Sequence, residues 1–135
     1  MFRLAKIAGK GRGLLAARPI GAGTVIERAP AVRLSPADRA ALDRTALFPY
    51  CFADPASYRP EDGARDDRAG HDGLLAFGAL TFCNHAANPN AAVRWESDSL
   101  GLWAELTALR DIAEGQEITL FYTNIDEYAD EDFEF

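Results

Sequence analysis

The sequence predicts a single, mainly β domain with a minor α component. Its length of 135 residues is the ordinary size of one domain. Short apolar segments, separated by turns that contain glycine or proline, recur along most of the chain, and only one stretch has the signals of a helix start. A hydrophobic content of 48% is enough to build a core.

The first third of the chain predicts strands joined by tight turns. Residues 2–7 alternate in polarity as a half-buried strand does. Residues 9–13 contain three glycines, which tolerate positive φ in a turn. Further strands are expected at residues 14–18 and 24–34.

One helix is expected after these strands. Ser35 is suited to the N-cap, Pro36 to the first helical position and Asp38 to the first turn, and the helix should run to about Ala46. The segment 53–73 is polar and broken by proline and glycine, which predicts a surface loop or variable insert.

The rest of the chain predicts more strands. Residues 74–80 fit either a short helix or a strand. Residues 91–96 and 100–109 are expected to form two strands around a short polar turn. Residues 117–122 are the last expected strand.

A weak internal repeat links two distant segments. Residues 18–26 and residues 110–118 both follow the pattern R-x-I-x-x-G-x-x-I. Each copy is expected to leave one strand, turn at its glycine and begin the next strand. Two copies do not make a solenoid, so the repeat predicts two similar corners in one domain.

The formal net charge of −7 is unevenly distributed. Residues 1–32 carry six basic residues and one acidic residue, whereas residues 126–135 carry six acidic residues and no basic one. The sequence therefore predicts a nearly neutral domain of residues 1–125 and an acidic, aromatic C-terminal tail of residues 126–135. The acidic balance argues against general binding of nucleic acid.

The composition also bears on location. The sequence has no apolar run of 18 residues, so we expect no membrane span or membrane partner. The first residues lack the apolar centre and cleavage site of a signal peptide. Two cysteines cannot form a disulfide framework, which fits a reducing compartment. We expect a cytoplasmic protein, or a nuclear one if the source is eukaryotic; the excess of arginine over lysine favours a bacterial source.

No metal site or nucleophilic pair is predicted. His71, His85, Cys51 and Cys83 are the only histidines and cysteines, and they lack C-x-x-C or H-x-x-x-H spacing. Cys83 is better interpreted as a small buried residue. As a nucleophile with His85 as its base, it would lack an acid that orients the imidazole.

Three segments carry unusual chemistry. Residues 10–14 read KGRGL, residues 82–90 read FCNHAANPN, and residues 115–122 read GQEITLFY. The G-x-G is not a dinucleotide-binding fingerprint, because a strand is expected to follow it instead of a helix. Asn84 and His85 follow an apolar stretch and need internal partners, so they fit either a satisfied polar corner or a ligand pocket.

In this order and combination, the three motifs resemble those of the SET-domain protein-lysine methyltransferases. The resemblance extends from about residue 4 to residue 122. It implies the SET-domain β-clip fold: short antiparallel sheets and a C-terminal pseudoknot, in which the last segment threads under the loop with the N-H motif. On this resemblance residues 1–125 are the SET domain, with a variable insert at 33–75 that contains one short helix.

The resemblance implies S-adenosyl-L-methionine as cofactor, S-adenosyl-L-homocysteine as product, and no metal. By analogy, Gly11, Arg12 and Gly13 line the cofactor through their backbone. Asn84 and His85 contact its adenine through backbone groups, and the Asn84 side chain contacts its amino-acid part.

Tyr122 matches the catalytic tyrosine of these enzymes, at the point where the cofactor and the lysine channel meet. The Tyr-x-Phe segment of small bacterial-type members resembles Tyr50 and Phe52, so we expect these two, Phe77 and Tyr122 to line the substrate channel. Tyr58 competes with Tyr50 for this role, and core packing is the alternative for these aromatic residues.

The chemistry suits such a channel. A free lysine amine has a pKa of about 10.4 and must lose its proton before it can accept a methyl group. An apolar channel and the nearby sulfonium cation both disfavour the ammonium form. A dedicated base is therefore not required.

Several positions depart from the family pattern. Many relatives have aspartate where this chain has Phe121, and Ala86 and Ala87 replace the usual Ser-Cys. Strand alternation puts Phe121 on the face opposite Tyr122. No cysteine follows Tyr122 in this sequence. We therefore expect no zinc-binding module of the kind that closes the lysine channel in many members.

Something else must then close the channel. We expect the tail to fold over it with Tyr128, Phe133 and Phe135 inward and its acids toward a basic peptide; a solvated terminus is the alternative. A homodimer would also close the channel.

The expected function is S-adenosylmethionine-dependent methylation of a lysine in a basic protein or peptide. The alternative is a catalytically degenerate SET-fold module that binds a basic partner, and a weaker third option is methylation of a small amine. Phe121, Ala86 and Ala87 favour the binding module, whereas the intact glycine, Asn-His and tyrosine motifs favour the enzyme.

Overall fold

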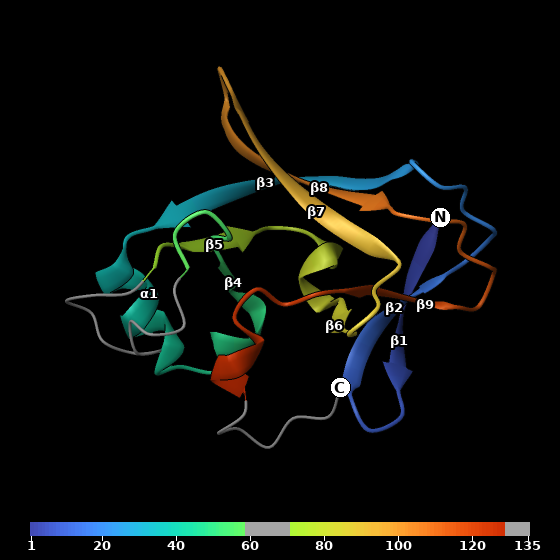
Figure 1. Cartoon of the computed structure of the whole chain (residues 1–135), viewed down its shortest axis with the longest axis horizontal. Coiled ribbons are helices and arrows are strands. Elements are labelled where there is room, and N and C mark those ends of the chain that lie inside the picture. The colour runs from blue at the N-terminus through green and yellow to red at the C-terminus, as the bar shows by residue number, and fades with distance from the viewer. Residues whose placement is uncertain (59–70, 129–135) are drawn as a thin grey trace.

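The computed structural model describes residues 1–58 and 71–128, in which nine strands form two sheets (Figure 1). The larger sheet has the order β4-β5-β3-β8-β7, and all its neighbouring strands are antiparallel. Its strands are β3 (Val25–Leu34), β4 (Phe52–Ala53), β5 (Gly73–Ala76), β7 (Ala91–Asp98) and β8 (Gly101–Ala108).

The smaller sheet has the order β1-β2-β9-β6. Its central pair joins the two ends of the sequence, because β2 pairs antiparallel with β9. The short strand β6 lies parallel to β9. These strands are β1 (Phe2–Ile7), β2 (Gly11–Ala16), β6 (Asn84–His85) and β9 (Glu117–Leu120). The prediction of a mainly β fold is confirmed.

The predicted helix is confirmed as α1 (Pro36–Asp43). The Ser35 hydroxyl accepts a hydrogen bond from the Asp38 N–H (3.2 Å), as an N-cap does. The helix ends sooner than predicted. The N–H groups of Arg44 and Thr45 donate three residues back, to the Ala41 (3.3 Å) and Leu42 (2.9 Å) carbonyls, and the Thr45 hydroxyl also donates to the Leu42 carbonyl (2.5 Å).

Residues 74–80, which fitted either a strand or a helix, contain part of each. The segment begins in β5 and ends in the 3-10 helix η3 (Ala79–Phe82). The Glu27 carboxylate on β3 accepts hydrogen bonds from the N–H groups of Ala79 (3.0 Å) and Leu80 (2.7 Å). This bond pair fixes the start of η3, which leads directly into the N-H motif.

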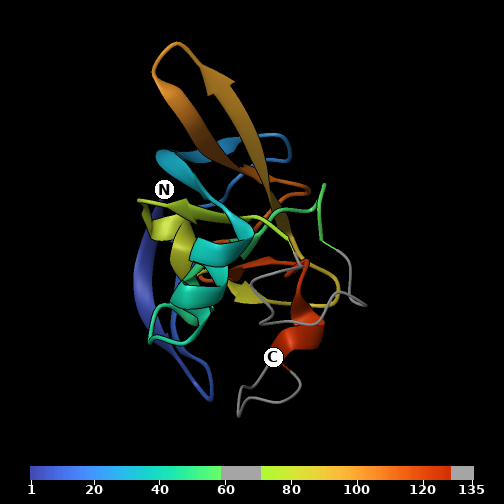
Figure 2. The same cartoon turned by 90° about the vertical axis from the view of Figure 1, so that its left-hand side faces the viewer.

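The core lies between the two sheets. Leu14 of β2 and Ile118 of β9 belong to the same buried cluster as Leu106 of β8, and all three are fully buried. Cys83 is also buried there, as its assignment as a small apolar residue predicted. Beyond this core the β7–β8 hairpin projects from the body of the molecule (Figures 1 and 2).

The two copies of the internal repeat pair with each other. Ile20 and Ile112 form an antiparallel bridge in which each N–H donates to the other residue's carbonyl, at 2.9 and 2.8 Å. The Gly23 N–H donates to the Ala108 carbonyl, and the Gly115 N–H donates to the Ala16 carbonyl, both at 2.8 Å.

These reciprocal hydrogen bonds make the two corners approximately equivalent. Gly23 and Gly115 have φ of +84° and +83°, values that side chains with a Cβ rarely adopt. At each corner, the glycine N–H of one half of the chain is hydrogen-bonded to a strand of the other half. The repeat predicted two similar corners but not that they would be partners.

Among the described residues, no helix is both long enough and apolar enough to span a membrane.

Candidate functional site

Two cavities lie side by side in the structure and share part of their walls. The larger has a volume of about 520 Å³ and the smaller about 290 Å³. Both are lined by Pro49, Tyr50, Thr81, Tyr122 and Tyr128.

We call the larger one the basic cavity. It is lined by Lys6, Lys10 and Arg12 and, among the described residues, by no acidic side chain. Asn84 and His85 also line it. The structure therefore brings the first two sequence motifs together, although they are far apart in the chain.

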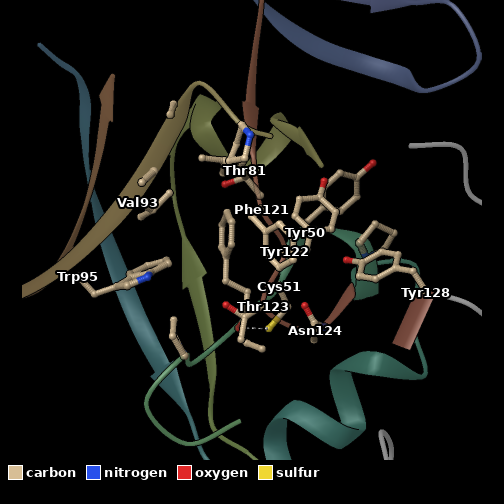
Figure 3. A pocket seen from close by; sticks show the side chains of 18 of the residues that line it. Tyr50, Cys51, Thr81, Val93, Trp95, Phe121, Tyr122, Thr123, Asn124 and Tyr128 are labelled. Atoms are coloured by element: carbon tan, nitrogen blue, oxygen red, sulfur yellow. Dashed lines mark hydrogen bonds between the residues drawn. The ribbon is translucent and has the colours of Figure 1, made fainter. Parts of the chain in front are cut away.

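We call the smaller one the aromatic cavity, after its rings: Tyr50, Phe52, Trp95, Phe121, Tyr122 and Tyr128. None of the described residues that line it is charged. Figure 3 shows Val93 and Trp95 on one side of Phe121, and Tyr50, Tyr122 and Tyr128 on the other.

The Asn84 side chain is held by two acceptors. Its amide nitrogen donates to Glu117 Oε2 (2.7 Å) and to the Arg12 carbonyl (3.1 Å). Glu117 Oε1 lies 3.5 Å from the Lys10 ammonium. Both Asn84 N–H bonds are directed to protein groups, so the carboxamide oxygen is the atom suited to accept a bond from a ligand.

Gly13 has a different place from the one predicted. It lines neither cavity. A Cβ at Gly13 would lie 2.7 Å from Ile7 Cγ1, 2.8 Å from Asn84 Nδ2 and 2.9 Å from Glu117 Oε2. Gly13 is therefore required so that the Asn84–Glu117 pair can pack against β2. Gly11 does line the basic cavity, with φ of +80°.

Tyr122 is fixed at both its backbone and its hydroxyl. Its N–H donates to His85 Nδ1 (2.9 Å), and its hydroxyl donates to the Cys83 carbonyl (2.7 Å). Burial raises the pKa of Tyr122 above its ordinary value, and neighbouring Cys83 and Glu117 raise it further. The side chain is therefore a neutral, oriented phenol near pH 7.

His85 is held in its neutral form. Burial lowers its pKa, and the Lys10 ammonium lowers it further. Because Nδ1 accepts the Tyr122 N–H, the proton of the neutral ring is on Nε2. The imidazole also contacts the Phe121 ring, with the centroids 4.8 Å apart. His85 thus positions the segment that carries Tyr122.

The final asparagine of the second motif docks its loop onto β9. Asn90 is buried, donates to the Glu117 carbonyl (2.8 Å) and accepts from the Thr119 N–H (2.9 Å). Arg110 supports the same loop, because its guanidinium donates to the Pro89 carbonyl (3.0 Å). The motif therefore includes both residues that line the cavity and residues that hold the loop.

The predicted channel residues lie in different places in the structure. Tyr50 lies in the 3-10 helix η1 (Phe48–Tyr50) and lines both cavities, and Phe52 lines the aromatic cavity. Phe77, predicted as a channel residue, lines neither cavity and is 61% exposed. It follows buried Ala76, so strand alternation turns its ring outward. Tyr58, the competitor of Tyr50, contacts His71 instead.

Several site residues were not predicted from the sequence, among them Lys6 of the basic cavity. Thr81 lines both cavities, and Trp95 lines the aromatic cavity from β7. Neither has a local signal that distinguishes it from an ordinary surface or core residue. Glu117 does have one, because it lies in the third motif between the glycine and the tyrosine.

The described part of the predicted tail packs against the site. The 3-10 helix η4 (Ile125–Tyr128) ends at Tyr128, which is 3% exposed. The Tyr128 ring contacts Phe48 (4.9 Å between centroids) and Tyr122 (5.2 Å). Phe133 and Phe135, which we also expected to fold inward, lie outside the described residues.

Within residues 1–58 and 71–128, no group of three or more His, Cys, Asp or Glu side chains is arranged to hold a metal ion.

Comparisons with known proteins point in one direction. Residues 11–123 match the family model of the SET domain. No curated protein sequence matches significantly. Among solved structures, a Plasmodium falciparum protein provisionally assigned as a histone methyltransferase has a TM-score of 0.61 at 19% identity, over 90% of this chain and 96% of its own.

A second solved structure is DIM-5 of Neurospora, a SET domain protein and histone lysine methyltransferase. It has a TM-score of 0.61 at 20% identity, over 90% of this chain and 51% of its own. At these identities the two neighbours establish the fold, and the family model covers most of the chain. The chain therefore belongs to the SET domain family.

Proposed function

We propose that this chain is an S-adenosylmethionine-dependent protein-lysine N-methyltransferase. The basic cavity would hold the cofactor and the aromatic cavity the target lysine. The observation that carries the proposal is that Tyr50 and Tyr122 lie on the wall shared by the two cavities. Cofactor and amine could therefore meet beside the oriented hydroxyl of Tyr122.

The residues of the basic cavity fit the cofactor. Its volume of about 520 Å³ is within the range of about 300–1,000 Å³ that is typical of small-molecule sites. Lys6, Lys10 and Arg12 suit the carboxylate of the amino-acid part, and the Asn84 carboxamide oxygen suits its ammonium group. S-adenosylmethionine supplies a methyl group on a positively charged sulfur.

An adenine ring needs an apolar or aromatic surface. Phe82 and Tyr50 supply one, with their ring centroids 5.2 Å apart. The Arg12 guanidinium covers the Phe82 ring at 4.4 Å. This stack joins the glycine-rich turn to η3 and orders one side of the cavity.

The aromatic cavity suits a lysine that must lose its proton. Its described lining contains no charged residue to stabilise an ammonium ion, so desolvation lowers the pKa of an amine that enters it. Tyr122 is not suited to remove the proton as a phenolate, because its own pKa is raised. Its hydroxyl is instead fixed by the Cys83 carbonyl, and the oxygen can contact the transferring methyl group.

The main contribution of the protein would therefore be alignment. The parallel pairing of β6 with β9 and the His85–Tyr122 bond place the N-H motif and Tyr122 side by side. The same pairing supports the pseudoknot crossing implied by the family. Alignment of reacting groups is a large source of rate enhancement when no acid or base acts directly.

The second candidate function is a SET-fold module that binds a basic partner without turnover. Phe121 favours it, since its ring contacts His85 at a tilt of 58° where many relatives have a carboxylate. Ala86 and Ala87 also depart from the family pattern. The intact Asn84–Glu117 and Tyr122–Cys83 contacts favour the enzyme.

Calorimetry with S-adenosylmethionine tests the cofactor assignment. The wild-type protein should bind it, and Asn84→Ala should weaken binding about tenfold or more, because a bond to a charged group is lost. Asn88→Ala is the matched control, since Asn88 is exposed in the same loop and does not line the basic cavity. Equal affinities for the two variants would contradict the assignment.

Turnover separates the two candidate functions. The protein should transfer a labelled methyl group from S-adenosylmethionine to lysine residues of proteins in a lysate of the host, with mass spectrometry to locate the modified lysine. Binding of the cofactor without any transfer would favour the binding module.

A further inference from the structure

Only part of the aromatic cavity adjoins the basic cavity. At one end Tyr50, Tyr122 and Tyr128 also line the basic cavity. At the other end Trp95 and Phe52 line the aromatic cavity alone. We call these the phenol end and the indole end, and Figure 3 shows Phe121 between them.

The indole end is built from two elements that do not adjoin in the sheet. Phe52 is on β4 and Trp95 is on β7, at opposite edges of the five-stranded sheet. Their rings meet edge to face, with the centroids 5.3 Å apart. Val93 extends the same surface along β7. The surface is therefore formed by the fold and not by one flexible segment.

The charges of β7 are directed elsewhere. Arg94 and Glu96 alternate with Val93 and Trp95 and pair with each other at 2.8 Å on an exposed face. The indole end is therefore an apolar and aromatic surface, and none of the described residues that line it is charged. Phe121, which is 55% exposed, extends this surface outward.

A target lysine cannot use this surface. Its unbranched side chain must reach the phenol end to place the amine beside Tyr122, so it cannot fill the indole end at the same time. A second apolar group from the same substrate can occupy it at the same time, because the two ends belong to one continuous cavity.

We propose that the indole end is a specificity pocket for a large apolar side chain, such as leucine, methionine or phenylalanine, next to the target lysine. The proposal rests on the proposed function and names its substrate class: a lysine in an apolar local context. The described lining of the cavity itself offers no carboxylate to a neighbouring arginine or lysine.

A peptide series on the full-length protein tests this. Each peptide has one lysine, and one neighbouring position at a time is leucine, phenylalanine, serine or arginine. At one or more positions, leucine or phenylalanine should raise kcat/KM roughly 10- to 100-fold over serine, the gain expected from burial of one such side chain. Arginine should do no better than serine.

The two tryptophans provide a matched pair of variants. Trp95→Ala should reduce the preference for leucine over serine to about twofold or less, because the pocket surface is removed. Trp103→Ala should keep the wild-type preference, since Trp103 lies on β8 against Arg28 and lines neither cavity. Binding of S-adenosylmethionine to each variant shows that it is folded, and the wild-type series stands if Trp95→Ala fails to fold.

The outcomes distinguish a failure of the apolar pocket from a failure of the proposed methyltransferase function. Methylation of all peptides at similar rates, or a preference for arginine, overturns the apolar pocket and leaves the methyltransferase intact. Retention of the leucine preference in a folded Trp95→Ala protein also overturns it. Failure to methylate any peptide, with no binding of S-adenosylmethionine, overturns the proposed function and the pocket with it.

Discussion

Glu117 organises the basic cavity without lining it. Its carboxylate accepts the Asn84 amide on one oxygen and faces the Lys10 ammonium on the other. Two of the sequence motifs therefore meet through a residue of the third. The carboxylate decides which way the Asn84 carboxamide is turned, and so which atom is presented to a ligand.

Replacement of this carboxylate by an amide should disturb the cavity without removing a residue from it. Glu117→Gln keeps the size of the side chain but loses the ion pair with Lys10 and can orient Asn84 either way. We expect about tenfold weaker binding of S-adenosylmethionine by calorimetry. Exposed Glu114→Gln should bind like wild type; equal binding by both would show that Asn84 is oriented by other means.

His85 makes a specific contribution to the pH dependence of stability. Its pKa is lowered by burial and by Lys10, so the unfolded chain binds the proton more readily than the folded protein. This contribution is fully present above a pH of about 6.5, the ordinary histidine value, and is lost as the pH falls through the lowered pKa.

Thermal melts between neutral and mildly acidic pH measure this effect. The wild-type Tm should fall on acidification more steeply than that of His85→Gln, whose amide oxygen can still accept the Tyr122 N–H. All other side chains are common to the two proteins, so the difference between them isolates His85. If Tm changed with pH in the same way for both proteins, protonation of His85 would not destabilise the folded state.

At the scale of elements, the loop of the second motif is held to β9 by Asn90. Asn90→Ala removes a donor to the Glu117 carbonyl and an acceptor for the buried Thr119 N–H. We expect a loss of about 3 kcal/mol in the free energy of unfolding, measured with denaturant, because buried backbone groups lose their partners. Asn88→Ala in the same loop should change it by less than about 0.5 kcal/mol.

The elements themselves were largely predictable. Alternation and turn residues identified most strands, though not the two-residue strands β4 and β6, and Ser35 with Pro36 identified α1. The ends were less predictable, because they depend on contacts absent from local sequence. β9, for example, stops at Leu120, and soon after it the Tyr122 N–H donates to distant His85.

The site residues were likewise predictable only in part. Asn84, His85 and Tyr122 were predicted because they occur in ordered motifs that a whole family shares. Trp95 was not, because its place beside Phe52 depends on two strands at opposite edges of one sheet. Phe77, also named as a channel residue, is exposed and lines neither cavity.

At the scale of the whole molecule, the paired corners make the two halves of the chain interdependent. Gly23 and Gly115 adopt the left-handed backbone at related positions, and each donates its N–H to a strand of the other half. Gly23→Ala and Gly115→Ala should each cost about 1–2 kcal/mol in stability, by a similar amount for both.

Gly21→Ala provides the control for this pair. Its backbone is not left-handed, and an added Cβ would be 3.8 Å from its nearest neighbour, the Thr24 hydroxyl. Denaturant unfolding should therefore show a change of less than about 0.5 kcal/mol. A large difference between the costs of Gly23→Ala and Gly115→Ala would show that the two corners are alike in geometry but not in energy.

The position of β9 between β2 and β6 has a consequence for synthesis on the ribosome. The smaller sheet cannot be completed until Glu117–Leu120 has left the exit tunnel, long after β2 has been made. Until then β2 presents an unpaired edge, and its apolar residues lack their cover. The nascent chain must therefore wait with exposed strands, the state that chaperones recognise and that aggregates when synthesis outpaces folding.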